Sequence, residues 1–313
     1  MHNRTFHPFL RLAVLAAFLF VHTAWSQAPA AEHPRALISA GEVPELREKI
    51  KQEPFKNWVQ YFEKDTRARE KEIGKNDEDA VQTGYLAFHQ AGMYLFTGKQ
   101  SWADAAWQTL VKVLEDPHIT NDPVSRGLNR ATVLKLMALT YDLAFNGWSE
   151  QQCRRANNKI YEVMLNTSSN MGLEANYSLA SNWMGIRYAS VLLASKVYDD
   201  FEATSHRTRA KPFEWDATNR LLEHLEANFY ENGWNGESLG YFAYNWSFVG
   251  PALITLFNNS SIDFSYLPPK LTNAMRGYCT AFLPIEGNGS TGVKIDLSDD
   301  GPGGNPLHML AYA

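Results

Sequence analysis

Cysteine is scarce in this chain of 313 residues, which contains only Cys153 and Cys279. Two cysteines can supply neither a disulfide framework nor a cysteine-rich metal site. We therefore expect two buried thiols, with a bridge as the alternative in an oxidising compartment. An excess of basic residues is also missing, because 29 Lys and Arg stand against 34 Asp and Glu. This balance argues against a nucleic-acid partner.

Motifs for phosphate or metal binding are missing as well. The sequence has no Gly-rich phosphate loop, no His-Glu-x-x-His and no Cys-x-x-Cys pair. Residues 296–301 resemble the start of a calcium loop, but Leu307 stands where the loop needs a bidentate Glu, so we expect a polar turn. No metal or cofactor is predicted. The histidines add little, since we expect His89 in the core and His118, His206 and His224 in solvent.

No apolar run is long enough for a transmembrane helix, which needs roughly 20 residues. The nearest candidate is residues 12–21, which follow Arg4 and Arg11 and precede small residues. This pattern predicts a secretory signal over residues 1–26, with an uncleaved anchor as the alternative. The mature chain, residues 27–313, is then expected in the periplasm or outside the cell, and off the membrane after cleavage.

Hydrophobic residues, by contrast, are plentiful at 45%, and aromatics reach 13%. A composition of this kind builds a large core and excludes disorder. The pattern along the chain is helical throughout, and two kinds of helix alternate. Charged amphipathic helices are predicted over 54–72, 102–115, 149–165, 214–231 and 268–283. Nearly uncharged, buried helices are predicted over 79–97, 127–144, 183–197 and 244–257. Ser149 and Gln152 indicate a capping box.

This alternation predicts an all-α fold, an incomplete (α/α)5-6 toroid in which inner helices form a ring and outer helices wrap it. A plain helical solenoid is the alternative. The long links from outer to inner helices, 116–126, 166–182, 232–243 and 284–303, would all lie at one end of a toroid. The inner helices begin at that end, so their N-termini would favour an anionic ligand there.

Two of these links carry candidate site residues. Ser181 and Asn182 directly precede a buried helix, and we expect either that they supply its N-cap or that Asn182 binds a ligand carboxylate. Arg187 follows in the same apolar helix and must pair with an internal acid or a substrate anion. The other link combines glycines and Glu237 with aromatics that could stack on sugar rings. For Phe242 and Trp246 in that segment, the alternative is a place in the core.

Four motifs resemble the heparinase II/III-like and alginate-lyase-like polysaccharide lyases. They are the opening His33-Pro-Arg35 segment with residues 42–47, residues 138–143 with 148–150, Ser181-Asn182-Trp183, and residues 234–244. The resemblance runs from about His33 to the end of the chain. It implies an α/α toroid followed by an antiparallel β-sandwich domain, for which we expect no counterpart within these 313 residues. It also implies β-elimination on an anionic, uronic acid-containing polysaccharide.

In such lyases an Asn neutralises the uronate carboxylate and a Tyr moves the proton. The resemblance therefore implies Asn182 in the first role and Tyr241 in the second, with Tyr244 as the alternative to Tyr241. Because the two links would meet at one end of a toroid, we expect Trp183, Arg187, Trp234 and Glu237 to bind substrate around these residues. Many of these lyases have His where Trp183 stands. Two other functions stay open: a toroid glycoside hydrolase using Glu237 with Asp296 or Glu286, and a non-catalytic glycan-binding or scaffold toroid.

Overall fold

The computed structural model of the protein describes residues 32–73, 79–120, 125, 127–174, 178–201, 209–230, 237, 239–259, 273, 282–283 and 293–294. Several predicted features lie outside the described residues: the signal segment, Trp234, His206, Cys279, Glu286 and the calcium-like segment 296–301.

The all-α prediction is confirmed for the described part of the chain. Its helices are η1 (Ala40–Glu42), α2 (Val43–Lys49), α3 (Phe55–Ile73), α4 (Ala80–Thr97), α5 (Gln100–Glu115), α6 (Leu128–Ala144), η2 (Phe145–Gly147), α7 (Glu150–Glu174), α8 (Asn182–Val197), α9 (Lys211–Asn228) and α10 (Leu239–Asn259). The described strands are β1 (Phe282–Leu283) and β2 (Val293–Lys294), which pair antiparallel.

The helix predicted over 268–283 is wrong at its last two residues, which form β1. Leu283 directly precedes Pro284. A residue before proline is driven away from the α conformation toward extended backbone, because the proline ring clashes with it. This clash explains why a helical pattern does not continue through residue 283.

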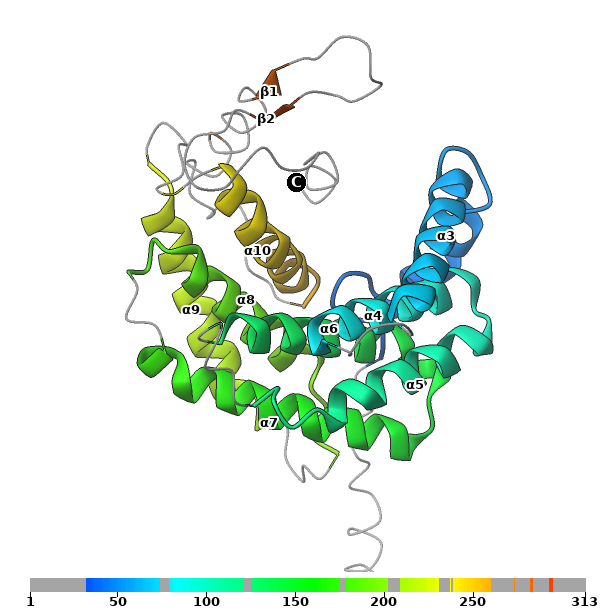
Figure 1. Cartoon of the computed structure of the whole chain (residues 1–313), viewed down its shortest axis with the longest axis horizontal. Helices are drawn as coiled ribbons and strands as arrows, with labels where there is room; N and C mark the ends of the chain where they lie inside the picture. Colours follow the sequence, from blue (N-terminus) through cyan, green and yellow to red (C-terminus); the bar gives the residue numbers. More distant parts are fainter. Residues whose placement is uncertain are drawn as a thin grey trace, which may run out of the picture.

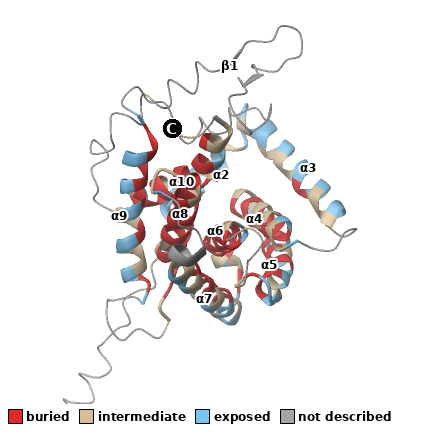
Figure 2. Cartoon of the chain, turned by 60° about the vertical axis from the view of Figure 1, so that its left-hand side comes forward, coloured by how far each residue is buried: buried red, intermediate tan, exposed pale blue. Residues whose placement is uncertain are grey.

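The alternation of buried and half-exposed helices is confirmed. Nearly every residue of α6 and α8 is buried, and Ala138 and Leu192 have no exposed surface. In Figure 2 these two helices are mostly red, whereas α3 and α9 show a pale blue, exposed face. Cys153, on the inward face of α7, is a buried free thiol, as expected.

Two layers of helices result from this packing. The inner helices α4, α6, α8 and α10 pack one against the next in chain order. Outside them, α3 and α5 pack on α4, α7 packs on α6 and α8, and α9 packs on α8 (Figure 1). The inner row therefore supplies the largest part of the core, and the outer helices cover one side of it.

Helix ends follow local sequence signals. The predicted capping box is confirmed, since Ser149 N–H donates to Gln152 Oε1 at 2.8 Å and Gln152 N–H donates to Ser149 Oγ at 3.3 Å. Asp79 caps α4 by accepting from the Val81 N–H at 2.9 Å. The same helix ends at Gly98, whose φ of 66° is accessible to glycine at little cost.

An N-terminal segment, residues 33–47, runs across the C-terminal ends of the inner helices. Arg35 donates to the carbonyls of Lys196 at 2.9 Å and Val197 at 2.8 Å, at the end of α8. Arg47 donates to the Leu95 carbonyl at 2.9 Å, at the end of α4. Arginines at these positions satisfy carbonyls that a helix end leaves unpaired and complement its negative dipole.

The ends of α6 and α10 contact the same segment. Asn146, just after α6, donates to the His33 carbonyl at 2.6 Å. Asn258, in the last turn of α10, donates to the Ala36 carbonyl at 2.9 Å. All four inner helices therefore end at the N-terminal segment, and they begin at the opposite end of the layer.

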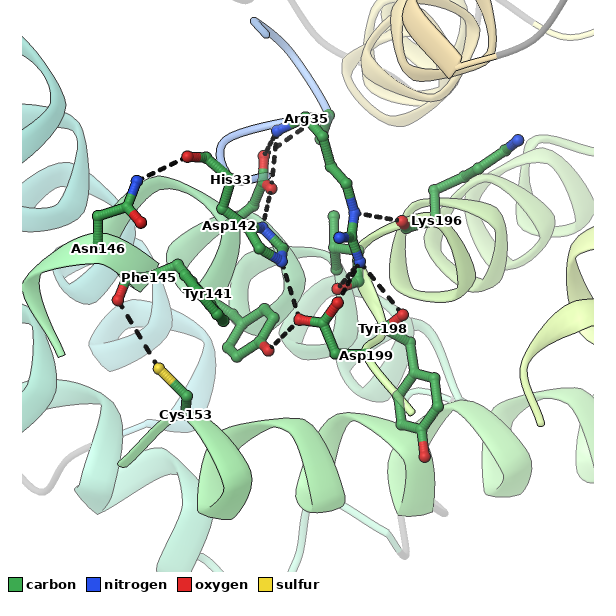
Figure 3. A network of polar contacts seen from close by, with 12 residues as sticks. His33, Arg35, Tyr141, Asp142, Phe145, Asn146, Cys153, Lys196, Tyr198 and Asp199 are labelled. Atoms are coloured by element: carbon green, nitrogen blue, oxygen red, sulfur yellow. Dashed lines mark hydrogen bonds and ion pairs between the residues drawn. The ribbon is translucent and has the colours of Figure 1, made fainter. Parts of the chain in front are cut away.

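A buried polar network fixes this segment (Figure 3). His33 Nδ1 lies 2.6 Å from Asp142 Oδ1, and His33 Nε2 lies 2.9 Å from Asp199 Oδ2. The Asp199 carboxylate also accepts from the Tyr141 hydroxyl at 2.5 Å and from Arg35 at 2.9 Å. Because each polar group finds a partner, the network ties residues distant in sequence together without leaving a buried charge unpaired.

Candidate functional site

The predicted site residues gather where the inner helices begin. The Glu237 carboxylate, two residues before α10, accepts from the Asn182 backbone N–H at 2.9 Å and from Asn182 Nδ2 at 2.7 Å. Asn182 is the first residue of α8. The starts of these two helices therefore touch, and α8 and α10 run in the same direction.

The start of α8 thus already holds a carboxylate. Ser181, and not Asn182, is the N-cap, and its hydroxyl accepts from the Trp183 N–H. Asn182 itself is 2% exposed, and both of its donors point to Glu237. A backbone N–H at a helix N-terminus, a side-chain amide and the helix dipole all favour a negative charge at this position.

The loop before α8 is held from α9. His224 Nδ1 lies 2.5 Å from the Leu179 carbonyl, and Asn228 donates to the Ala180 carbonyl. Asn245, on α10, donates to His224 Nε2 at 2.8 Å. With Nε2 accepting, Nδ1 carries the proton and donates to the loop. The loop that presents Asn182 is therefore fixed by side chains of both neighbouring helices.

The expectation that His224 is solvated is wrong, because His224 has no exposed surface. Burial lowers the pKa of His224, although its hydrogen bonds to Leu179 and Asn245 oppose the shift. Its place depends on Gly185, where a Cβ atom would collide with His224 Nε2 and Asn245 Oδ1. This glycine lets α8, α9 and α10 meet at one point.

Aromatic residues at the start of α10 divide into two groups. Phe242 and Trp246 are 3% and 4% exposed, so their alternative reading as core residues is confirmed. Tyr244 is 39% exposed. Tyr241 is half-buried and lies in the first turn of α10, which begins five residues before the predicted start, so the expectation of a loop at Tyr241 is wrong.

The packing of Phe242 explains this longer helix. Its ring contacts Phe229 at 5.6 Å and stacks on Trp246 at 6.0 Å between centroids. Burying two large aromatics on one helical face stabilises the first turn by more than Gly240 costs it. The site tyrosines therefore sit on a regular helix.

Arg187 has no exposed surface, and its guanidinium lies over the Trp183 ring at 5.5 Å from the centroid. Cation–π contacts of this kind favour the charged group inside a protein. The two residues expected to bind substrate, Trp183 and Arg187, are thus neighbours on α8. Trp234, expected beside them, lies outside the described residues.

A second polar cluster, of which only Tyr244 was predicted as a site residue, lies one to two turns into the inner helices. We call Tyr85, Lys135 and Tyr244 the tyrosine–lysine cluster; they come from α4, α6 and α10. Lys135 Nζ lies 3.7 Å from the centroid of the Phe248 ring and 5.9 Å from that of Tyr85. The Phe248 ring in turn contacts Tyr244 at 5.5 Å.

The titration of this cluster follows from its burial. Burial raises the pKa of Tyr85, and the nearby Tyr244 adds to the shift. Burial also raises the pKa of Tyr244, against a hydrogen bond with Thr132 that lowers it. The pKa of Lys135, which is 5% exposed, falls to about 7 because of burial. At neutral pH the cluster therefore holds two protonated tyrosines and an amine close to its titration midpoint.

A sequence signal for Lys135 exists in retrospect. It is one of three charged side chains, with Arg130 and Asp142, in a helix whose other residues are uncharged and mostly buried. A charge in a fully buried helix needs a partner or a function. Its neighbours Tyr85 and Phe248 are 50 and 113 positions away, and nothing in the sequence indicates that they lie beside it.

Within the part of the chain that the structure describes, no group of three or more His, Cys, Asp and Glu could hold a metal ion. None of the described helices is long and apolar enough to cross a membrane.

No protein-family model matches the sequence, and no curated protein is found to be similar to it.

Proposed function

We propose that this chain is the α/α toroid part of an exported polysaccharide lyase, which cleaves uronic acid-containing polysaccharide by β-elimination. The observation that carries the proposal is the carboxylate held by Asn182 at the start of α8. Recognition of a carboxylate is the first requirement of this reaction, because the C5 proton of a uronate becomes removable only when the carboxylate charge is neutralised.

In this proposal the uronate carboxylate takes the place that Glu237 holds. The Asn182 amide and backbone N–H then donate to the substrate, and the dipole of α8 adds to their effect. Glu237 must move aside for this to happen, which makes it a competitor of the substrate at the same donors. The four resembling motifs support the same roles.

Tyr244 or Tyr241 moves the proton. The surroundings of Tyr244 favour it, since its side chain reaches solvent and its raised pKa keeps the hydroxyl protonated at neutral pH. A protonated tyrosine can donate to the leaving glycosidic oxygen, and the phenolate that remains takes the C5 proton, so that the C4–O and C5–H bonds break, the C4–C5 double bond forms and the tyrosine is restored. Tyr241 lies one turn earlier on the same helix and is the residue that the motif itself indicates.

The toroid is part of the proposal. In a solenoid each repeat contacts only its neighbours. In the described chain each outer helix and the inner helix after it form a hairpin: α3–α4, α5–α6, α7–α8 and α9–α10. Lys135, in the second hairpin, lies beside Tyr85 of the first and Phe248 of the fourth. Contacts between hairpins that are not sequence neighbours favour an inner row that curves round toward itself.

The test is the initial rate of ultraviolet-absorbing, unsaturated product on a panel of uronate polymers. Tyr244→Phe should lower the rate by roughly 10²- to 10⁴-fold with little change in KM, and Asn182→Ala should impair both. Tyr161→Phe, the same change on the outer helix α7, is the matched control and should leave the rate unchanged. Full activity of both Tyr244→Phe and Tyr241→Phe would refute the assigned chemistry.

A further inference from the structure

Lys135 is a buried lysine whose charge lacks a carboxylate neighbour. Its Nζ is directed to the Ser247 carbonyl at 3.4 Å and to the face of Phe248, and no carboxylate of the described residues forms an ion pair with it. Lys196, whose side chain is only 10% exposed, does have a carboxylate neighbour: its Nζ lies 3.0 Å from Glu214 Oε1. A charged group in an apolar setting without such a partner is costly.

The groups that face Lys135 are neutral at neutral pH. From α4 the titratable group beside Lys135 is Tyr85; on α10, Tyr244 acts on Tyr85 and contacts the Phe248 ring over which Lys135 lies. Among the described residues of the other helices packed on α6, no charged group contributes to its titration, because burial is the sole cause of its shift. The Lys135 amine therefore lies beside the rings of Tyr85 and Phe248, and the described residues bring no carboxylate to it.

We propose that Lys135 anchors a carboxylate of the ligand, so that an acidic sugar supplies the counter-charge and the Tyr85 and Tyr244 hydroxyls donate to the same sugar. The proposal rests on the proposed function only for the class of ligand, uronic acids. It adds a second carboxylate contact beside that of Asn182, as a polymer with a carboxylate on successive rings allows.

Proton uptake is the specific consequence. Above about pH 7 the free amine of Lys135 is mostly neutral, and a bound carboxylate favours its charged form. Binding then draws a proton from solution. Well below that pH the amine is already charged, and the same binding takes up none. A neutral sugar should show no uptake at either pH.

The experiment is calorimetric titration of the full chain with glucuronate, galacturonate, mannuronate and guluronate, and with the matching neutral sugars. Monosaccharides have no glycosidic bond to cleave, so turnover does not interfere. Comparing buffers of different ionisation enthalpy at about pH 8 and about pH 6 gives the protons taken up. We expect close to one proton at the higher pH and close to none at the lower, for at least one uronate.

Lys135→Met keeps the length of the side chain and removes the charge; it should abolish the uptake and weaken uronate binding by about tenfold or more. Lys196→Met, which removes a lysine that has its own carboxylate, should change neither. Circular dichroism of both variants establishes that they fold. Equal affinity and equal uptake in Lys135→Met, or no uronate binding by the wild type, would overturn the proposal. Uptake that depends on Lys135 without any unsaturated product from polymers would uphold it and refute the lyase instead.

Discussion

At Gly185, on α8, side chains from α9 and α10 lie close against the backbone. A methyl group there would meet side-chain atoms of His224 and Asn245, which are held in place by their own hydrogen bonds. Overpacking of this kind costs about 1–3 kcal/mol, more than the roughly 1 kcal/mol that alanine gains over glycine within a helix. We therefore expect Gly185→Ala to lower the free energy of unfolding measured in urea.

The matched control is Gly41→Ala, because a Cβ atom at Gly41 has no neighbour within 4 Å. Its effect should stay within about 0.5 kcal/mol. If both alanine variants unfold at the same urea concentration as the wild type, then His224 and Asn245 are free to move away and do not fix the loop before α8.

Asp199 links stability to pH. Burial alone would raise the pKa of Asp199, but the hydrogen bond from His33 and the charge of Arg35 outweigh it and lower the pKa. The unfolded chain therefore binds this proton more readily than the folded chain. The resulting stability is fully present above the ordinary pKa of an aspartate and is lost as pH falls through the lower, folded value.

We expect Asp199→Ala to cost about 3–5 kcal/mol at neutral pH, since it removes the carboxylate that pairs with His33 Nε2, with Arg35 and with the Tyr141 hydroxyl. Its loss of stability on acidification should be smaller than that of the wild type. Glu48→Ala, which removes one member of the exposed pair with Lys51, should change stability by less than about 1 kcal/mol. Urea unfolding from about pH 3 to pH 7 measures both, and parallel pH profiles for wild type and Asp199→Ala would contradict the assignment.

At the scale of the elements, α8 depends on the N-terminal segment for its last turn. Arg35 donates through separate nitrogens to the carbonyls of Lys196 and Val197. Lysine cannot reproduce this forked geometry. Arg35→Lys should therefore lower the local opening free energy of the last turn of α8 by about 1–2 kcal/mol, seen as faster amide hydrogen exchange there.

Arg220→Lys is the matched control, because Arg220 forms an exposed pair with Glu223 at 2.9 Å on α9. Exchange in α9 and α8 should be unchanged by it. Unaltered exchange at the end of α8 in Arg35→Lys would show that the segment rests on the helix without stabilising it.

Helix positions were largely predictable, because burial imposes a pattern on every turn. The helix predicted over 183–197 is found at Asn182–Val197, and that predicted over 127–144 at Leu128–Ala144. The wrong predictions are of helix ends, where the pattern of buried residues does not fix the boundary. The helix predicted to end at residue 165 continues to Glu174, and α10 begins earlier than its glycine and tyrosines indicate.

The site was predictable only in part, because residue types do not reveal which side chains meet. Asn182 and Glu237 were each selected from the sequence, yet their mutual hydrogen bonds depend on the parallel packing of α8 and α10. His224 was misjudged because its polar sequence neighbours conceal a buried face of α9. Lys135 was not predicted as a site residue, because the side chains around it come from α4 and α10, which are distant in sequence.

At the scale of the whole molecule, we propose that residues 1–26 are a secretory signal that is removed on export. The first described contacts of the chain are those of His33, so removal of residues 1–26 would leave the polar network intact. Expression of the full chain in a bacterial host should give a periplasmic protein whose N-terminus lies near Gln27, as measured by intact mass. Leu15→Arg, which interrupts the apolar run, should keep the protein in the cytoplasm at its full mass. A full-length wild-type protein in the membrane fraction would support the uncleaved anchor instead.

The central claim is β-elimination, and the composition of the product tests it most directly. When the protein digests a uronate polymer, each new reducing end should be matched by one unsaturated sugar. Proton NMR counts the unsaturated sugars, and a reducing-end assay on the same sample counts the new ends. New reducing ends without unsaturated sugars would show hydrolysis, and binding without new ends of either kind would show a glycan-binding protein. Either result would contradict the lyase.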